Sequence, residues 1–201
     1  DSLTRHGIDA DFHVPGEITM ALTEHQVGTV REGYELHRAH GIPVTLLDAA
    51  EARARVNSPR YLSGFLDPTV GLVDPARLVW GLADAAERLG VRLHEDTSVT
   101  GFDADIAGVT VRTEWGSVRA DRVVLGTGAF RGPLKRLAHY TLPVYDHVLM
   151  TEPLSPAQLD AVGWHGREGL TDAGNQFHYY RRTLDDRVLF GGYDANYHFP
   201  G

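Results

Sequence analysis

The sequence predicts a mixed α/β (α+β) fold. Two blocks in which strand, helix and strand follow one another lie in the first half of the chain. A meander of short strands with glycine-containing turns follows the second block, and the last third of the chain contains mostly strand signals. This order excludes an all-helical or an all-β domain.

The first block contains two strands, expected at 18–22 and 44–47, and each runs into a capped helix. Each helix start has a capping box, in which an N-cap side chain is followed three residues later by Glu or Gln: Thr23 with Gln26, and Asp48 with Glu51. Gly41 supplies a stop for the first of these helices.

The second block is built on the clearest helix of the chain. Asp74 is placed as the N-cap, Pro75 occupies the first helical position, and Gly90 follows the last turn. The apolar face is expected to consist of Leu78, Val79, Leu82, Ala86 and Leu89. Strands are expected afterwards at 91–94, 99–103, 109–113, 118–120, 122–125, 144–151, 177–182 and 188–192, with a helix near 131–137.

Composition and charge exclude several classes of protein. The chain of 201 residues has a net charge of -8, which argues against nonspecific binding to nucleic acid or to an anionic membrane. No apolar run approaches the roughly 20 residues of a membrane-spanning helix. The absence of cysteine excludes disulfides and thiolate chemistry and is compatible with the cytoplasmic location that we expect. His37 and His40 have helical spacing but no carboxylate pair beside them, so no metal site is predicted.

The segment 126–128 is a glycine turn that follows an apolar strand signal at 122–125. Glycines in such a turn let backbone N–H groups approach a phosphate closely. The chain contains neither G-x-G-x-x-G nor a Walker A sequence, so its own glycines do not establish a dinucleotide site.

Short motifs follow one another at 73–78, 90–91, 97–99, 120–129, 145–154, 177–181 and 186–194. Their order and spacing resemble the D-amino-acid oxidase superfamily of FAD-dependent oxidoreductases. The last two look closest to the branch that resembles gamma-glutamylputrescine oxidase. The resemblance implies FAD as cofactor, a partial FAD-binding Rossmann-like layer at 74–135, and a mixed-sheet substrate domain formed by 1–73 and 136–201.

The resemblance also implies a cofactor site. Val99 would contact the adenine side of FAD through its backbone, and Thr127, Gly128 and Ala129 would line the dinucleotide near its phosphates. The family's amino-terminal glycine motif, its ribose-binding acid and its carboxyl-terminal stretch have no counterpart here. We therefore expect an internal piece of such an enzyme, inactive and unable to hold FAD tightly by itself.

The expected strand at 177–182 supplies the candidates for substrate binding. Alternation places His178 and Tyr180 on one face, where they could hold an amine through cation–π contacts worth about 0.5–2 kcal/mol. His147, in the strand before, is a second-rank candidate. The alternative is sheet packing, because aromatic residues are good strand formers.

The predicted function is oxidation of a small-molecule amine or amino acid. The family chemistry comprises hydride transfer to flavin, imine hydrolysis and peroxide formation, and no side-chain base was identified. A non-catalytic substrate-recognition or interaction domain, and a nicotinamide-dependent reductase, are the alternatives. The sequence leaves the amine, the electron acceptor and the oligomeric state open.

Overall fold

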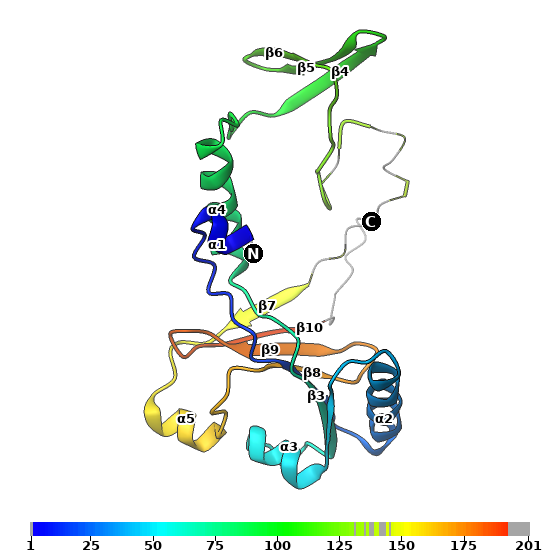
Figure 1. Ribbon diagram of the computed structural model, residues 1–201, viewed down its shortest axis with the longest axis vertical. Coiled ribbons are helices and arrows are strands. Elements are labelled where there is room, and N and C mark those ends of the chain that lie inside the picture. Colours follow the sequence, from blue (N-terminus) through cyan, green and yellow to red (C-terminus); the bar gives the residue numbers. More distant parts are fainter. Residues whose placement is uncertain are drawn as a thin grey trace, which may run out of the picture. The chain divides into compact units, whose positions relative to one another are not determined.

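The computed structural model describes residues 2–130, 132–134, 136, 139–140, 144 and 146–192 (Figure 1). The chain divides into two compact units. The larger contains residues 1–85 and 146–201, and the smaller contains residues 86–145.

A seven-stranded mixed sheet forms the larger unit, with the strand order β2-β3-β1-β8-β9-β10-β7. The first strands of the chain and the last lie in one sheet because β1 pairs with β8 in parallel, Glu17 opposite Gly169. All other neighbours are antiparallel. The strands are β1 (Glu17–Ala21), β2 (Thr45–Leu47), β3 (Ser63–Asp67), β7 (His147–Met150), β8 (Gly169–Asp172), β9 (His178–Arg182) and β10 (Val188–Gly192).

Five helices are described: α1 (Ser2–His6), α2 (Glu24–Ala39), α3 (Ala49–Arg55), α4 (Pro75–Arg88) and α5 (Pro156–Val162). The predicted capping boxes at Thr23 and Asp48 are confirmed, and the Asp74 carboxylate accepts hydrogen bonds from the first turn of α4. Helix α5 was not predicted, although Ser155 and Gln158 form a third capping box at its start.

Each face of the large sheet has its own core. On one face, Ile18, Met20 and Leu170 pack against α3 and the segment that follows α5, including Trp164. Figure 1 shows α3 and α5 on the same side of this sheet. On the other face, α2 covers Ala21 and Phe65. A third cluster joins α4 to the residues that follow α1, through Ile8, Ala10 and Ala85.

The smaller unit contains a three-stranded antiparallel meander. Its strands are β4 (Val99–Asp105), β5 (Gly108–Thr113) and β6 (Gly116–Ala120), in the order β4-β5-β6. The predicted meander and the mixed α/β class are thus confirmed.

Two expected strands are wrong. Residues 91–94 and 122–125 form no strand, and Val124 is 92% exposed instead of buried on both faces. An apolar run becomes a buried strand only when neighbouring strands pair with it, and among the described residues none pairs with these segments. The expected helix at 131–137 lies partly outside the described residues, as does Tyr145 of the strand expected at 144–151.

No helix in the described part of the chain has the length and apolar character required to cross a membrane.

Candidate functional site

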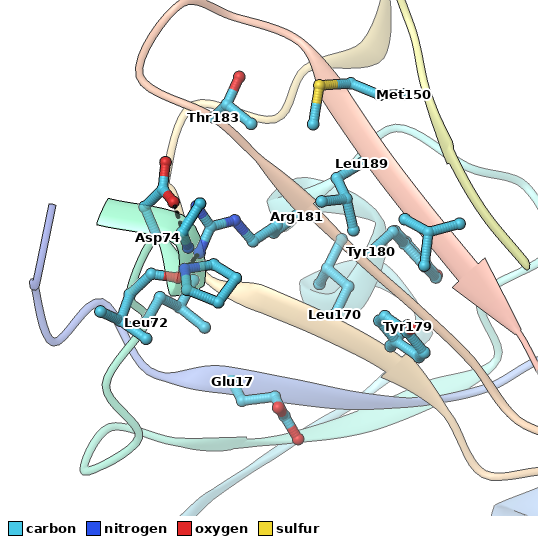
Figure 2. Close-up of a pocket in the computed structure, with 14 residues that line it drawn as sticks. Glu17, Leu72, Asp74, Met150, Leu170, Tyr179, Tyr180, Arg181, Thr183 and Leu189 are labelled. Atoms are coloured by element: carbon cyan, nitrogen blue, oxygen red, sulfur yellow. Dashed lines mark hydrogen bonds between the residues drawn. The ribbon is translucent and has the colours of Figure 1, made fainter. Parts of the chain in front are cut away.

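Two hollows lie in the larger unit, and β9 contributes Tyr179 and Arg181 to the large one, His178 to the small one and Tyr180 to both. The large groove has a volume of about 630 Å³ and is lined by residues including Glu17, Leu72, Met150, Tyr179, Arg181 and Leu189 (Figure 2). The small groove, of about 360 Å³, is lined by residues that include Tyr61, Trp164, His178, Tyr180 and Phe190. Strand alternation explains why His178 is separated from Tyr179 and Arg181, because successive side chains point to opposite faces of a sheet.

Tyr179 contributes an aromatic ring to the large groove. Its hydroxyl donates a hydrogen bond to Oδ2 of Asp146 at 2.7 Å. Gly191 lies opposite Tyr179 in the neighbouring strand β10, and a methyl group on Gly191 would overlap the tyrosine ring. The ring therefore occupies space that only a glycine leaves open.

We expect Gly191→Ala to displace Tyr179 and to lower the free energy of unfolding by about 1–3 kcal/mol, because extra volume in a packed site forces neighbours to move. Chemical denaturation measures the change. Gly28→Ala is the control, since a methyl group there meets nothing within 4 Å and alanine favours a helix by up to about 1 kcal/mol. Equal stability of the Gly191→Ala variant and the native chain would contradict the prediction.

Arg181 places a guanidinium group in the large groove. Its Nη1 donates a hydrogen bond to the Val73 carbonyl oxygen at 2.6 Å, and Figure 2 shows the side chain extending toward the start of α4. The buried Nε has no hydrogen-bond partner, and within the described residues no acid forms an ion pair with Arg181. A buried donor without a partner costs about 1–3 kcal/mol.

Glu17 and Asp74 are the two acids that line the large groove. Burial, together with the nearby negative charge of Asp67, raises the pKa of Glu17 above its ordinary value. The folded chain therefore holds the proton of Glu17 at pH values where the unfolded chain has released it.

This shift predicts how stability depends on pH. Since the folded state binds more protons, the free energy of unfolding falls as pH rises from the ordinary pKa of Glu17 through its raised pKa. Glu17→Gln removes this dependence, so the stability of the variant relative to the native chain should be greater at pH 8 than at pH 4. Urea denaturation at the two pH values measures the difference, and an unchanged difference would refute the raised pKa.

The small groove contains two hydrogen-bonded pairs. Nδ1 of His178 lies 2.8 Å from Oδ2 of Asp172, whose carboxylate is buried. The hydroxyl groups of Tyr61 and Tyr180 are 2.8 Å apart. Burial, with the hydrogen bond to Tyr61, raises the pKa of Tyr180, so this phenol stays neutral well above the usual range.

The structure brings two of the three substrate candidates together. His178 and Tyr180 both line the small groove, and the ring of Phe190 stacks on each of them. His147 lies exposed on the edge strand β7 and lines neither groove. Tyr179, Arg181 and Glu17 were not singled out from the sequence. Alternation in β9 identified the face of the first two, but nothing in the sequence showed which face is hollow.

The expected cofactor residues lie in the smaller unit. Val99 begins β4 and is exposed. Thr127, Gly128 and Ala129 form an exposed turn, in which Gly128 has φ +55° and the Thr127 carbonyl accepts a hydrogen bond from the N–H of Phe130. The N–H groups of Thr127, Gly128 and Ala129 have no partner among the described residues. Free N–H groups in a glycine turn are suited to nucleotide phosphates.

The part of the chain that the structure describes has no group of three or more His, Asp or Glu side chains that could hold a metal ion.

Comparison with known proteins identifies the family to which this chain belongs. The model of the DAO family, the FAD-dependent oxidoreductases, matches residues 1–201. The chain therefore belongs to this family of flavoproteins.

Two curated relatives illustrate the similarity. The chain is 32% identical over 195 residues to gamma-glutamylputrescine oxidoreductase of Escherichia coli (strain K12), covering 96% of this chain and 45% of the relative. It is 28% identical over 199 residues to glycine oxidase of Geobacillus kaustophilus, covering 94% and 53%. The chain thus spans about half the length of these relatives.

Solved structures share the fold. The crystal structure of glycine oxidase from Geobacillus kaustophilus matches with a TM-score of 0.76 at 24% identity, covering 96% of this chain and 51% of that one. Glycine oxidase from Bacillus cereus matches with a TM-score of 0.79 at 17% identity, covering 98% and 53%.

Proposed function

We propose that the protein containing this chain oxidises a small amine or amino acid with FAD as cofactor. The large groove carries this proposal, because it is an open, mostly apolar hollow with an aromatic ring, Tyr179, and a few charged groups on its walls. Such hollows are the default binding sites for small organic ligands. Because the chain belongs to the FAD-dependent family, we assign oxidation of the ligand by flavin to this groove.

We assign the cofactor side to residues 74–135. In this proposal the turn at Thr127, Gly128 and Ala129 lies against the dinucleotide phosphates, where its unpaired N–H groups donate hydrogen bonds, and the backbone of Val99 contacts the adenine side. The residues 1–73 and 136–201 form the substrate side. A cytoplasmic location belongs to the same proposal and rests on the absence of cysteine.

The large groove lies next to the first turn of α4, with Asp74, Pro75 and Ala76 on its wall. This helix opens the segment assigned to the cofactor side. Met150 and Leu189 provide apolar walls that exclude water, and Tyr179 offers a ring face to the ligand.

The bound flavin would supply the hard step, accepting a hydride from the carbon next to the amine nitrogen. The side chains of the groove would hold that carbon in position. Hydrolysis of the imine product and formation of hydrogen peroxide with oxygen complete the proposed reaction.

The test uses the protein as its gene encodes it. We expect absorbance in the flavin region, and bleaching of that absorbance under argon when an amine or amino acid is added. Stopped-flow absorbance of Tyr179→Phe and Tyr180→Phe variants then compares the hydroxyl group bonded to Asp146 with the hydroxyl group bonded to Tyr61 in the small groove. We expect slower bleaching in the Tyr179 variant and little change in the Tyr180 variant.

The small groove around His178 and Tyr180 is the alternative substrate site. Its aromatic walls and the carboxylate of Asp172 favour a cationic amine. A reversed result, in which Tyr180→Phe slows bleaching and Tyr179→Phe does not, would place the substrate there, and His147 would then become worth testing. A protein without flavin absorbance would refute the proposed function.

A further inference from the structure

Three residues on three neighbouring strands form a row across the large groove. Glu17 of β1 pairs with Gly169 of β8. The register of β8 with β9, Leu170 opposite Tyr180, places Gly169 level with Arg181. Since neighbouring strands are about 4.8 Å apart, the backbones at Glu17 and Arg181 are separated by about 10 Å.

The centre of this row is apolar. Gly169 has no side chain, and a methyl group built on it would lie 3.3 Å from Cδ2 of Leu72 and 3.6 Å from Oε2 of Glu17. The glutamate carboxylate thus leans over the glycine, and Leu72 covers the same position. This row therefore presents an acid, an aliphatic surface and a guanidinium group in sequence, and the Asp74 carboxylate lies elsewhere on the wall of the groove.

The side chains of Glu17 and Arg181 do not form an ion pair with one another. Within the described residues, neither Glu17 nor Arg181 takes part in an ion pair. Arg181 donates one hydrogen bond, to the Val73 carbonyl, and its buried Nε remains without an acceptor. A charge in a mostly apolar hollow is stabilised by an opposite charge, so each end of the row favours a ligand group of the other sign.

We propose that Arg181 and Glu17 determine substrate specificity in the large groove by selecting ligands with an anionic group at one end and a cationic group at the other, joined by a short aliphatic segment. The carboxylate of such a ligand accepts hydrogen bonds from Arg181. Its ammonium group lies at Glu17, and its methylene groups lie along Leu72 above Gly169. This inference rests on the proposed function only in placing the ligand in the same groove.

Isothermal titration calorimetry of the full-length protein, under argon at pH 8, tests the proposal with three probes. 4-Aminobutanoate carries both charges, butylamine carries only the cation, and butanoate carries only the anion. We expect 4-aminobutanoate to bind about tenfold or more tightly than either single-charge probe, since a hydrogen bond to a charged group contributes about 1.5–3 kcal/mol, and 1.4 kcal/mol is tenfold in affinity.

Two variants separate the ends of the groove. Arg181→Gln should reduce the affinity for 4-aminobutanoate to that of butylamine, and Glu17→Gln should reduce it to that of butanoate. Arg31→Gln and Glu87→Gln make the same chemical changes at exposed positions and should leave the affinities unchanged. The thermal midpoint of each variant confirms that it is folded.

Equal affinities for 4-aminobutanoate and butylamine would overturn the inference, as would failure of all three probes to bind or equal losses in the control variants. These outcomes are independent of the flavin. A flavin spectrum without preference for the doubly charged probe would refute the specificity role alone, whereas the preference without a flavin spectrum would refute only the proposed oxidation.

Discussion

Ile18→Ala should lower the free energy of unfolding by about 2–5 kcal/mol, because it leaves a cavity in the centre of the larger unit. Ile18 is fully buried and packs in the same cluster as Met20 and Leu170. Three strands, β3, β1 and β8, lie side by side at this position, so the structure cannot easily close around the missing atoms. Urea denaturation, followed by tryptophan fluorescence, measures the loss.

The control is Ile106→Ala, which removes the same atoms from a fully exposed side chain. We expect its stability to lie within about 0.5 kcal/mol of the native chain. Similar losses in both variants would show that Ile18 does not lie in a close-packed core.

Asp172→Asn should lower the free energy of unfolding by about 2–3 kcal/mol, because the buried carboxylate accepts hydrogen bonds that an amide cannot all accept. Oδ1 accepts the N–H of Gly174 at 3.0 Å, and Oδ2 accepts the N–H of His178 at 3.1 Å and contacts its Nδ1 at 2.8 Å. An NH₂ group in place of either oxygen faces a donor. The loop from β8 to β9 should loosen, and His178 should leave the small groove.

Asp160→Asn is the matched control, because this side chain is exposed on α5. Chemical denaturation of both variants gives the stability difference, and the ¹H–¹⁵N spectrum reports whether the amide of His178 has moved. An unchanged spectrum with unchanged stability in the Asp172 variant would show that its hydrogen bonds contribute nothing.

Local signals in the sequence were sufficient to predict the structure of segments whose conformation depends only on nearby residues. We predicted correctly the capping boxes at Thr23 and Asp48, the proline at the start of α4 and the glycine turns of the meander. The conformation of a cap or a tight turn depends on residues three or four apart, so it can be predicted from a single sequence. The family followed from the order of several such segments.

Pairing between strands that are far apart in the sequence could not be predicted. β3 and β8 were missed because they are short and become strands through their neighbours, whereas 122–125 was predicted as a strand and finds no neighbour among the described residues. The same limit applied to the candidate site. Alternation in β9 was predicted, but Glu17 and Arg181 meet the same groove only through the pairing of β1, β8 and β9, which no local pattern reveals.

The parallel pairing of β1 with β8 has a consequence for the order of synthesis. Glu17 leaves the ribosome about 150 residues ahead of its partner Gly169, so for most of translation β1 has no neighbour on that side. Until then its apolar residues have only local contacts, with β3 and α2, to protect them from other unfinished chains. A ribosome stalled before residue 169 should therefore present a nascent chain that recruits chaperones and is digested readily by protease, and one stalled well beyond residue 192 should not.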